Sequence, residues 1–312
     1  MKNKLYLVLP CYNEEACLDE TTGRLKQKLK ELIEAKKIDK NSKIVYVDDG
    51  SKDKTWEKIS SYGSPVIGLK LARNRGHQNA LLAGLMYAKD HADIVISMDA
   101  DLQDDINAID KMLVEYENGC EIVYGVRSER KTDSAFKRRT ALGFYKVMNM
   151  LGAEVVYNSA DYRLMSKRAL EELSKFKEVN LFLRGLVPLI GLKTSEVKYP
   201  RAERFAGESK YPLKKMLKFA WDGITSFSIK PIRMVLWLGV LIFIISAIVT
   251  IYSLITKIAG NAVSGWTFII CSVWILGGLQ MISLGLVGEY VGKIYAESKG
   301  RPRYVIEKIV GE

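Results

Sequence analysis

The segment Ile94–Asp105 limits the possible folds of this chain more than any other, because a short apolar run ends in a cluster of acids. The apolar run predicts a buried strand, and four carboxylates follow within seven positions: Asp99, Asp101, Asp104 and Asp105. Like charges this close repel one another, so a fold retains them at a strand end mainly where a divalent cation or a cationic ligand neutralises them. The pattern predicts a metal-dependent site, with Asp99 and Asp101 as hard oxygen ligands suited to Mg²⁺ or Mn²⁺.

Strands and helices alternate along roughly the first two thirds of the chain. The sequence predicts strands over Lys4–Pro10, Ser42–Val47, Pro65–Leu71, Asp93–Met98 and Glu121–Tyr124, and helices over Glu14–Lys36, Lys54–Ser61 and Gly76–Lys89. This order is typical of a Rossmann-like α/β domain, in which helices cover both faces of a mostly parallel sheet. Ligands of such a sheet bind at the carboxyl ends of its strands.

Polar side chains follow each of the first four predicted strands. The four strand ends read Pro10-Cys11-Tyr12-Asn13-Glu14-Glu15, Asp48-Asp49-Gly50-Ser51, Arg73-Asn74-Arg75-Gly76-His77 and Asp99-Ala100-Asp101. Any one of these loops alone fits ordinary turn chemistry. Because the ends of parallel strands share one edge of a sheet, the four together predict a polar rim that binds a ligand.

Two uncharged segments in the last quarter of the chain predict membrane spans. Val235–Ile255 contains 21 residues and Trp266–Gly288 contains 23 residues, none of them charged. About 20 apolar residues cross a bilayer core of about 30 Å, whereas helices of soluble cores seldom run that long without a polar face. Basic residues flank the outer ends of both segments and the connection between them carries only Lys257, so both ends are expected in the cytoplasm.

The stretch Pro212–Ser228, just before the first span, predicts an amphipathic helix. Leu217, Trp221, Ile224 and Phe227 share one helical face, which suits a helix lying in the membrane interface. The formal net charge of +11 is densest near the membrane segments, and the chain has no nucleic-acid motif. An anionic membrane surface is therefore the predicted partner, and nucleic acid is not.

The strand-end motifs, taken together, resemble a known family. In chain order they read P-x-Y-N-E-E, V-D-D-G-S-x-D-x-T, A-R-N-R-G-H-Q-x-A and D-A-D-L-Q-D. This set resembles the family 2 glycosyltransferases of the GT-A fold, and within them the polyprenyl-phosphate glycosyltransferases, which include bactoprenol glucosyltransferases and dolichol-phosphate mannose synthases. Segments that resemble the acceptor motif, the basic loop and the tail of that group are Asn158–Met165, Arg201–Tyr211 and Gly288–Pro302.

The resemblance covers nearly the whole chain and implies its organisation. The implied parts are a GT-A catalytic domain over 1–211, an amphipathic juxtamembrane helix over 212–230, a transmembrane hairpin over 231–290 and a cytoplasmic tail over 291–312. A small-residue stripe on the second span, Gly278, Gly285 and Gly292, predicts close packing against the first span or against a second copy of the chain. Homo-oligomers are therefore an open expectation.

The resemblance also implies roles for individual residues. A metal, Mg²⁺ or Mn²⁺, would be held by Asp99, Asp101 and Gln103, and Asp101 and Asp161 would be catalytic. The nucleotide sugar would contact Pro10, Tyr12, Asn13, Glu14, Asp48, Asp49, Arg73, Gly76, His77, Asp99 and Ala100. The acceptor phosphate would contact Arg127, Arg163, Arg201, Arg204, Ser209 and Lys210. Arginine forks and mobile lysines both suit phosphate oxygens, although Arg127 fits a solvated surface arginine equally well.

The role of Asp161 stays open in the sequence. It is the family's candidate for a general base, yet a phosphate monoester with a second pKa near 6 is substantially ionised at neutral pH and needs little help to attack. A second possibility is that Asp161 orients the phosphate through neighbouring cations. A third is that it only pairs with Arg163 or caps a turn.

The favoured function is inverting transfer of one sugar, taken to be glucose, from a UDP-sugar to undecaprenyl phosphate at the cytoplasmic face of a bacterial plasma membrane. UDP-N-acetylglucosamine and GDP-mannose are alternative donors, because short motifs do not encode the sugar. A processive polysaccharide synthase is disfavoured, since no Trp in the chain follows an Arg. A catalytically silent membrane scaffold that only binds nucleotide sugars is disfavoured by the intact acids Asp48, Asp49, Asp99, Asp101 and Asp161.

Overall fold

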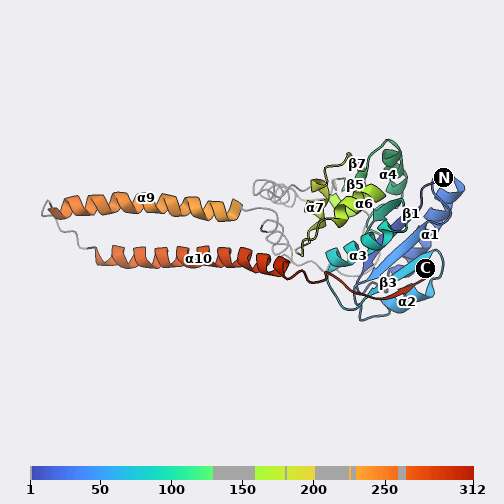
Figure 1. The fold of residues 1–312 in the computed structure, drawn as a ribbon, viewed down its shortest axis with the longest axis horizontal. Coiled ribbons are helices and arrows are strands. Elements are labelled where there is room, and N and C mark those ends of the chain that lie inside the picture. The colour runs from blue at the N-terminus through green and yellow to red at the C-terminus, as the bar shows by residue number, and fades with distance from the viewer. Residues whose placement is uncertain (1, 129–158, 180, 201–224, 226–229, 259–264) are drawn as a thin grey trace.

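The computed structural model describes residues 2–128, 159–179, 181–200, 225, 230–258 and 265–312. A sheet covered by helices forms one end of the molecule, and two long helices extend from it side by side (Figure 1). Apart from Thr225 and Lys230, the predicted amphipathic helix 212–230 lies outside the described residues. So do four residues predicted to bind the acceptor phosphate: Arg201, Arg204, Ser209 and Lys210.

The sheet contains the five predicted strands and three more. The strands are β1 (Leu5–Cys11), β2 (Lys43–Asp48), β3 (Val66–Leu71), β4 (Ile94–Ser97), β5 (Ile122–Arg127), β6 (Ser159–Ser166), β7 (Thr194–Tyr199) and β8 (Ile306–Val310). Their order across the sheet is β7-β5-β6-β4-β1-β2-β3-β8. Strand β1 runs parallel to β2 and β4, and β2 runs parallel to β3. The expectation of a mostly parallel sheet with four polar strand ends on one edge is confirmed.

Helices cover both faces of this sheet. They are α1 (Leu18–Glu34), α2 (Thr55–Ser61), α3 (His77–Lys89), α4 (Ala108–Glu117), α6 (Lys167–Ser174) and α7 (Leu183–Leu189). One apolar cluster packs α1 and α4 against the sheet, and a second packs α3, α6 and α7 on the other face. The helix predicted from Glu14 begins only at Leu18, because residues 14–17 form a turn in which the Cys17 N–H donates to the Glu14 carbonyl.

Strand β6 is antiparallel to both of its neighbours, β4 and β5, and the sequence did not predict it. Ser97 at the end of β4 pairs with Arg163, so the first residues of β6 lie beside the loop that follows β4. The Ser97 hydroxyl reinforces this register by donating to the Asp161 carbonyl at 2.6 Å. The reversed direction brings Asp161 to the rim formed by the carboxyl ends of the parallel strands.

The end of the chain returns to the sheet. Strand β8 pairs antiparallel with β3 and covers what would otherwise be an open sheet edge. The ion pair Lys70–Glu307, 3.1 Å long, joins the same two strands. The predicted boundary of the catalytic domain at residue 211 therefore leaves out one strand of its sheet. The prediction placed residues 306–310 in a cytoplasmic tail because they follow the two long apolar segments in the sequence.

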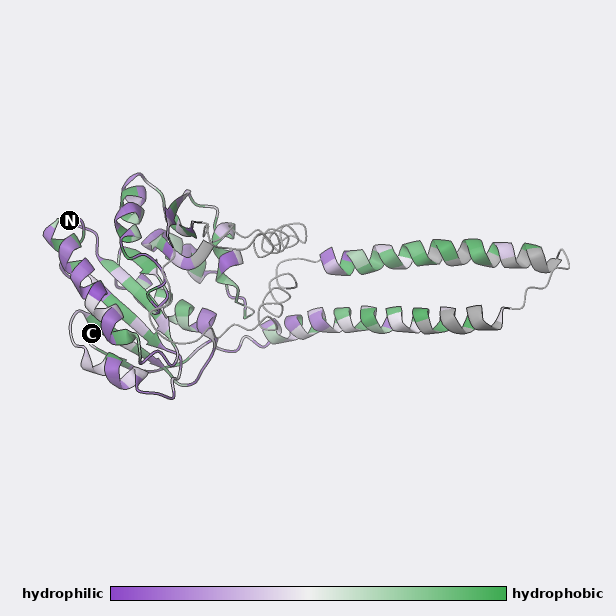
Figure 2. Ribbon diagram, turned by 180° about the vertical axis from the view of Figure 1, so that it is seen from behind, coloured by the Kyte–Doolittle hydropathy of each residue, from purple (hydrophilic) through white to green (hydrophobic). Residues whose placement is uncertain are grey.

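Two long helices follow the α/β part: α9 (Lys230–Ile258) and α10 (Trp266–Ser298). Figure 2 shows that hydrophobic residues predominate along both helices. Many of their apolar side chains are exposed, for example Trp237 and Met281, which are each 69% exposed. Among the described residues, one helical stretch, Ile275–Ser298, is long and apolar enough to cross a membrane. The predicted span over 235–255 lies within α9, and its passage through a bilayer stays a prediction.

The packing of α3 against the sheet generates a stability prediction. A Cβ added at Gly84 would lie 2.4 Å from Val8 Cγ1 and 2.7 Å from Val47 Cγ2, so the helix sits closer to the sheet than any larger residue allows. We expect Gly84→Ala to destabilise the protein by about 1–3 kcal/mol, which is typical of overpacking. The measurement is the shift of the thermal unfolding midpoint.

Gly23→Ala is the matched control for this prediction. Gly23 lies in α1, and an added Cβ there would meet no described atom within 4 Å. Replacing an exposed helical glycine by alanine should stabilise by about 0.5–1 kcal/mol. Equal unfolding midpoints for the two variants would show that α3 does not need its close approach to β1 and β2.

Candidate active site

The loops after β1 and β2 are joined by hydrogen bonds from backbone N–H groups to side-chain oxygens. The Asn13 N–H donates to Ser51 Oγ at 3.0 Å, the Lys52 N–H donates to Asn13 Oδ1 at 2.8 Å, and the Glu14 N–H donates to Thr55 Oγ1 at 2.9 Å. Asn13 adopts a positive φ of 53°, a conformation that asparagine tolerates better than most residues. Two predicted nucleotide-binding residues, Asn13 and Glu14, therefore help to fix the shape of the rim.

The acids at the end of β2 serve the same purpose. Asp49 accepts hydrogen bonds from the Arg75 N–H at 2.7 Å and the Gly76 N–H at 2.9 Å, which ties β2 to the start of α3. Asp48 accepts from the Ser51 N–H at 3.1 Å, and its other carboxylate oxygen is buried without a partner among the described residues. Burial raises the pKa of both carboxyls.

The other predicted nucleotide-binding residues occupy the same rim at different depths. Pro10 and Ala100 are buried, Tyr12 is half-buried, and Arg73 and Gly76 are exposed. Gly76 takes a φ of 86°, which only glycine adopts easily, and forms the N-terminal end of α3. The structure thus brings all four predicted strand ends together.

The acidic loop after β4 is held in place by a hydrogen bond from α1 and by one within the loop. The Thr21 hydroxyl on α1 donates to the Ala100 carbonyl at 2.8 Å, and Asp101 Oδ1 accepts from the Gln103 N–H at 3.1 Å. The Asp99 side chain is 31% exposed, whereas Asp101 is 6% exposed. Asp99 therefore faces the opening of the site and Asp101 lies deeper in the loop.

Electrostatics around this loop fit a bound divalent cation. Burial raises the pKa of Asp99 to about 6, the nearby charge of His77 opposes the rise, and the charges of Asp104, Asp161 and Asp101 add to it. A cation beside Asp99 and Asp101 would relieve this repulsion. Within the described part of the chain no three His, Cys, Asp or Glu side chains form a metal site alone, so water and substrate phosphates would have to complete the shell.

Asp161 is the centre of a buried ion cluster. Its carboxylate accepts hydrogen bonds from Arg163 Nη2 at 2.7 Å, Arg184 Nη2 at 3.1 Å and Gln78 Nε2 at 3.3 Å, and His77 Nε2 lies 3.4 Å away. Burial alone would raise the pKa of Asp161, but Arg184, His77 and Arg163 together hold it well below its usual range. A carboxylate that is so strongly stabilised in its ionised form is a weak proton acceptor.

Arg163 corrects one of the predictions. It was expected to contact the acceptor phosphate, but its side chain is 2% exposed and donates inward, to Asp161 and to the Leu183 carbonyl at 3.3 Å. Every residue of β6 from Asp161 onward is buried, so this strand has no solvent face to offer. Arg163 positions Asp161 and is not itself open to a ligand.

Two residues of the cluster were not predicted. Gln78 follows His77 in the third motif, and its Oε1 also accepts from the Leu183 N–H at 3.0 Å, so the motif itself carried the signal. Arg184 lies on α7 within an apolar stretch and belongs to none of the strand-end motifs. Its side chain is 29% exposed, which makes it the arginine of this cluster that reaches the surface.

His77 connects the two halves of the site. It is the first residue of α3, and its Nε2 lies between the Asp161 carboxylate and the Asp99 carboxylate, the latter 3.7 Å away. Burial would lower the pKa of His77, but the hydrogen bond to Asp161 and the negative charge of Asp99 outweigh it and raise the pKa. A protonated imidazole is therefore favoured between the acids.

Arg127 braces the acidic loop from β5. It donates to Asp104 through Nη2 at 3.0 Å, Tyr199 donates to the same carboxylate at 2.6 Å, and Arg127 Nη2 lies 3.9 Å from Asp99. The charge of Asp104 raises the pKa of Arg127 against the opposing effect of burial. Arg127 is thus an ion-paired side chain and not a solvated surface arginine. A contact with phosphate stays a prediction.

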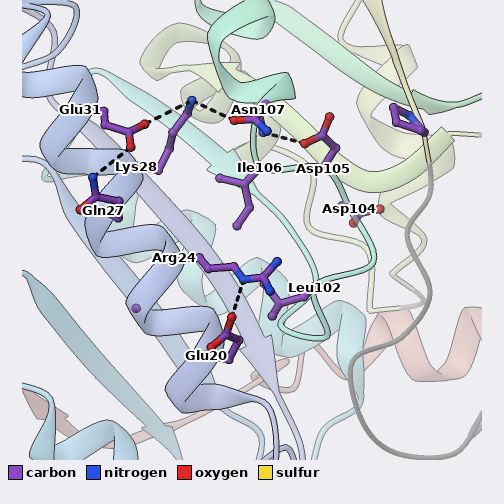
Figure 3. A pocket seen from close by; sticks show the side chains of 12 residues that line it. Glu20, Arg24, Gln27, Lys28, Glu31, Leu102, Asp104, Asp105, Ile106 and Asn107 are labelled. Atoms are coloured by element: carbon purple, nitrogen blue, oxygen red, sulfur yellow. Dashed lines mark hydrogen bonds and ion pairs between the residues drawn. The ribbon is translucent and has the colours of Figure 1, made fainter.

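A separate cavity of about 710 Å³ lies beside the acidic loop, between α1 and residues 102–107 (Figure 3). The residues that line the cavity bond to one another. Arg24 pairs with Glu20 at 2.7 Å within α1, and Lys28 Nζ donates to Asn107 Oδ1 at 3.4 Å. Asp48, Asp49 and Asp161 do not line it. The cavity therefore flanks the strand-end site and does not coincide with it.

The geometry defines a GT-A-like α/β enzyme, with paired acids at a strand end and a cationic cluster opposite them. Residues 6–174 match the glycosyl transferase family 2 model, and residues 230–294 match the GtrB C-terminal hairpin model. The protein is a glycosyltransferase and belongs to glycosyltransferase family 2, which confirms the resemblance seen in the sequence. Enzymes of this fold commonly use a divalent metal.

Several relatives are similar over nearly the full length. An uncharacterized glycosyltransferase of Bacillus subtilis, YkoT, is 56% identical over 306 residues, 97% of this chain and 91% of that protein. A prophage bactoprenol glucosyl transferase homolog of Escherichia coli is 38% identical over 98% of this chain and 99% of its own. The bactoprenol glucosyl transferase of Shigella phage SfII is 39% identical over 98% of both chains.

The pKa of Asp99 generates a prediction about metal binding. Because a metal displaces the proton of a carboxyl, a group with a pKa of about 6 must lose it before binding, and affinity falls as the pH drops below that value. We expect Mn²⁺ to bind more tightly at pH 7 than at pH 5. Calorimetry in buffers of different ionisation enthalpy would measure both affinity and proton release, and equal affinity at both pH values would contradict the prediction.

Proposed function

We propose that this enzyme transfers glucose from UDP-glucose to undecaprenyl phosphate, with inversion at the anomeric carbon. The observation that carries the proposal is the full-length similarity to proteins named bactoprenol glucosyl transferase, at 38–39% identity. The polar rim supports it, because it places a pair of acids beside a cationic cluster within one site. One half suits a diphosphate leaving group and the other suits an anionic acceptor.

The donor half of the proposal rests on the loops after β1, β2 and β4. Asp99, Asp101 and Gln103 would hold Mg²⁺ or Mn²⁺, and the ion when bound would supply Lewis-acid stabilisation of the charge that grows on the departing diphosphate. The loops around Asn13 and Asp49 would hold the nucleotide. Their hydrogen bonds fix the shape of these loops before the nucleotide binds. Arg127, near Asp99, would add a positive charge on the same side.

The acceptor half rests on the Asp161 cluster. One negative charge on Asp161 faces the positive charges of Arg163 and Arg184, with His77 favoured in its protonated form, so the cluster carries excess positive charge. This charge attracts a phosphate dianion that is already nucleophilic. Asp161 then acts by holding Arg184 in place and not by removing a proton.

The basic loop would complete the capture of the lipid headgroup. Arg201, Arg204, Ser209 and Lys210 keep the role that the resemblance implies, next to the proposed interface helix over 212–230. Arginine forks bind phosphate oxygens in bidentate fashion. The loop and the Asp161 cluster would thus bind the same headgroup from two sides.

The membrane part of the proposal takes α9 and α10 as two spans of a plasma-membrane hairpin. Both helices expose apolar side chains along their length, which suits contact with lipid. With Lys230 and Arg233 before one span and Arg301 and Arg303 after the other, the α/β domain would face the cytoplasm. Self-association through the glycine stripe of α10 stays an expectation.

A panel of labelled donors tests the function directly. Purified protein with Mg²⁺ and undecaprenyl phosphate should move label from UDP-glucose into a butanol-extractable lipid, and more slowly from UDP-N-acetylglucosamine or GDP-mannose. Label in an insoluble polymer would indicate a processive synthase. Label that stays in the aqueous phase with every donor would indicate a binding protein without transferase activity.

The metal assignment has its own test. Asp101→Asn should lower the rate of transfer by at least about 10²-fold even at saturating Mg²⁺, because a neutral amide binds a hard divalent ion poorly. Asp90→Asn, at the far end of α3, is the control and should match the wild type. Near-wild-type turnover of the Asp101 variant would remove this carboxylate from the metal site.

Arg184 provides a test of the acceptor half. Arg184→Gln should raise the KM for undecaprenyl phosphate about tenfold or more while leaving the affinity for UDP-glucose unchanged, because it removes the exposed cation of the cluster. Arg168→Gln, at an exposed position of α6, is the control. An equal loss of affinity for donor and acceptor would contradict the assignment of Arg184 to the acceptor side.

A further inference from the structure

The C-terminal end of α10 grips a segment of the α/β domain that lies far from it in sequence. Both carboxylate oxygens of Glu297 accept from the Val179 N–H at 2.8 Å, across 118 residues of chain. One turn beyond the helix, Arg303 Nη1 donates to the carbonyls of Phe176 and Glu178 at 3.2 and 3.4 Å. We call these bonds the α10 clamp and residues 176–179 the clamped segment.

The clamped segment leads directly into the acceptor half of the site. The Leu181 N–H donates to the Val179 carbonyl at 2.9 Å, and the buried residue Leu183 begins α7. The Leu183 N–H and carbonyl bond Gln78 and Arg163, and the next residue, Arg184, bonds Asp161. Hydrogen bonds at Val179 and Leu183, joined by the short chain segment between these two residues, therefore connect the end of α10 to the Asp161 cluster.

The helix end that makes the clamp is itself tied to the sheet. Between α10 and β8 lie only residues 299–305, and the Ala72 N–H donates to the Val305 carbonyl at 3.0 Å just before β8 begins. The position of Glu297 relative to the sheet is thus set by its own bond to Val179 and by the attachment of the following residues to β3. By contrast, the hydrogen bonds that shape the donor loops, around Asn13 and Asp49, join the loops after β1 and β2 to each other and to the residues just before α3, and none of them involves the clamped segment.

We propose that Glu297 and Arg303 are positioning residues of the transferase. By holding the clamped segment to the end of α10, they set the position of α7, so that Arg184 meets Asp161 in the geometry that receives the acceptor phosphate. The effect on the acceptor rests on the proposed function, whereas the effect on α7 does not. The clamp makes the acceptor half, and not the donor half, sensitive to the membrane-proximal helix.

The test compares four variants of the full-length protein in lipid nanodiscs. Glu297→Ala removes both carboxylate oxygens that accept from Val179, and Glu297→Gln retains one oxygen acceptor. Arg303→Gln replaces the arginine, which donates to Phe176 and Glu178, by a shorter and uncharged side chain. Glu289→Ala, two turns earlier on the same helix, is the matched control. For each, three quantities are measured: amide hydrogen exchange of peptides covering Val179 and α7, the dissociation constant of UDP-glucose, and the KM for undecaprenyl phosphate.

We expect Glu297→Ala to accelerate exchange at Val179 and in α7 and to raise the acceptor KM about tenfold, as the loss of a charge-assisted hydrogen bond allows. Glu297→Gln should show a smaller effect of the same kind, and Arg303→Gln should resemble it. The UDP-glucose dissociation constant and all properties of Glu289→Ala should match the wild type. A general structural defect would instead weaken donor binding as well.

Two results would overturn the proposal. The first is unchanged exchange in α7 in Glu297→Ala, which would show that the clamp does not hold that helix. The second is faster exchange with an unchanged acceptor KM, which would show that the position of α7 is irrelevant to the acceptor. If the wild type transfers no sugar to the lipid, the proposed function fails, and the exchange difference alone decides whether the clamp holds α7.

Discussion

The buried carboxylate of Asp161 is the interaction on which the arrangement of the site depends. An ionised carboxylate at 6% exposure requires partners, and it finds them on three elements: Arg163 on β6 itself, His77 and Gln78 on α3, and Arg184 on α7. Removal of one partner from a buried ion pair typically costs about 3–5 kcal/mol. The cluster therefore fixes the relative positions of α3, β6 and α7 more firmly than apolar packing alone would.

The same cluster explains how one site treats two kinds of charge. Under the proposed function, Asp99 and Asp101 would need a cation between them and the diphosphate, whereas Arg163 and Arg184 beside Asp161 would attract an anion directly. His77 lies between the two regions, with its Nε2 3.7 Å from Asp99 and 3.4 Å from Asp161. Under the proposed function, the boundary between a metal-dependent donor half and a metal-independent acceptor half would pass through a single imidazole.

The local sequence pattern was sufficient to predict the parallel strands β1 to β4, but not β6 to β8. Strands β1 to β4 follow one another at short intervals, so apolar runs with polar ends revealed both the strands and their common rim. Strand β6 pairs with β4 across more than sixty residues and in the opposite direction, and β8 pairs with β3 from the far end of the chain. Such pairings leave no local signal in one sequence.

The individual residues divide in the same way. Asp99 and His77 belong to two different strand-end motifs, and the structure places them 3.7 Å apart on the rim that these motifs predicted. Arg163 misled the prediction because β6 is buried on both faces, so a charge on it has no outward direction. Arg184 was missed because one arginine among apolar residues shows nothing about its partner until α7 is placed on β6.

Within the described part of the chain, α10 is attached to the α/β domain in two ways, and this has a physical consequence. A single linker would let the domain rotate about the end of the helix, but β8 on one side and the Glu297 and Arg303 bonds on the other define an orientation. Under the proposed function the acceptor is a lipid phosphate confined to the headgroup layer, so the enzyme would have to hold its site at a constant height above the bilayer. The return of the chain to the sheet after α10, where β8 pairs with β3, would supply that fixed position.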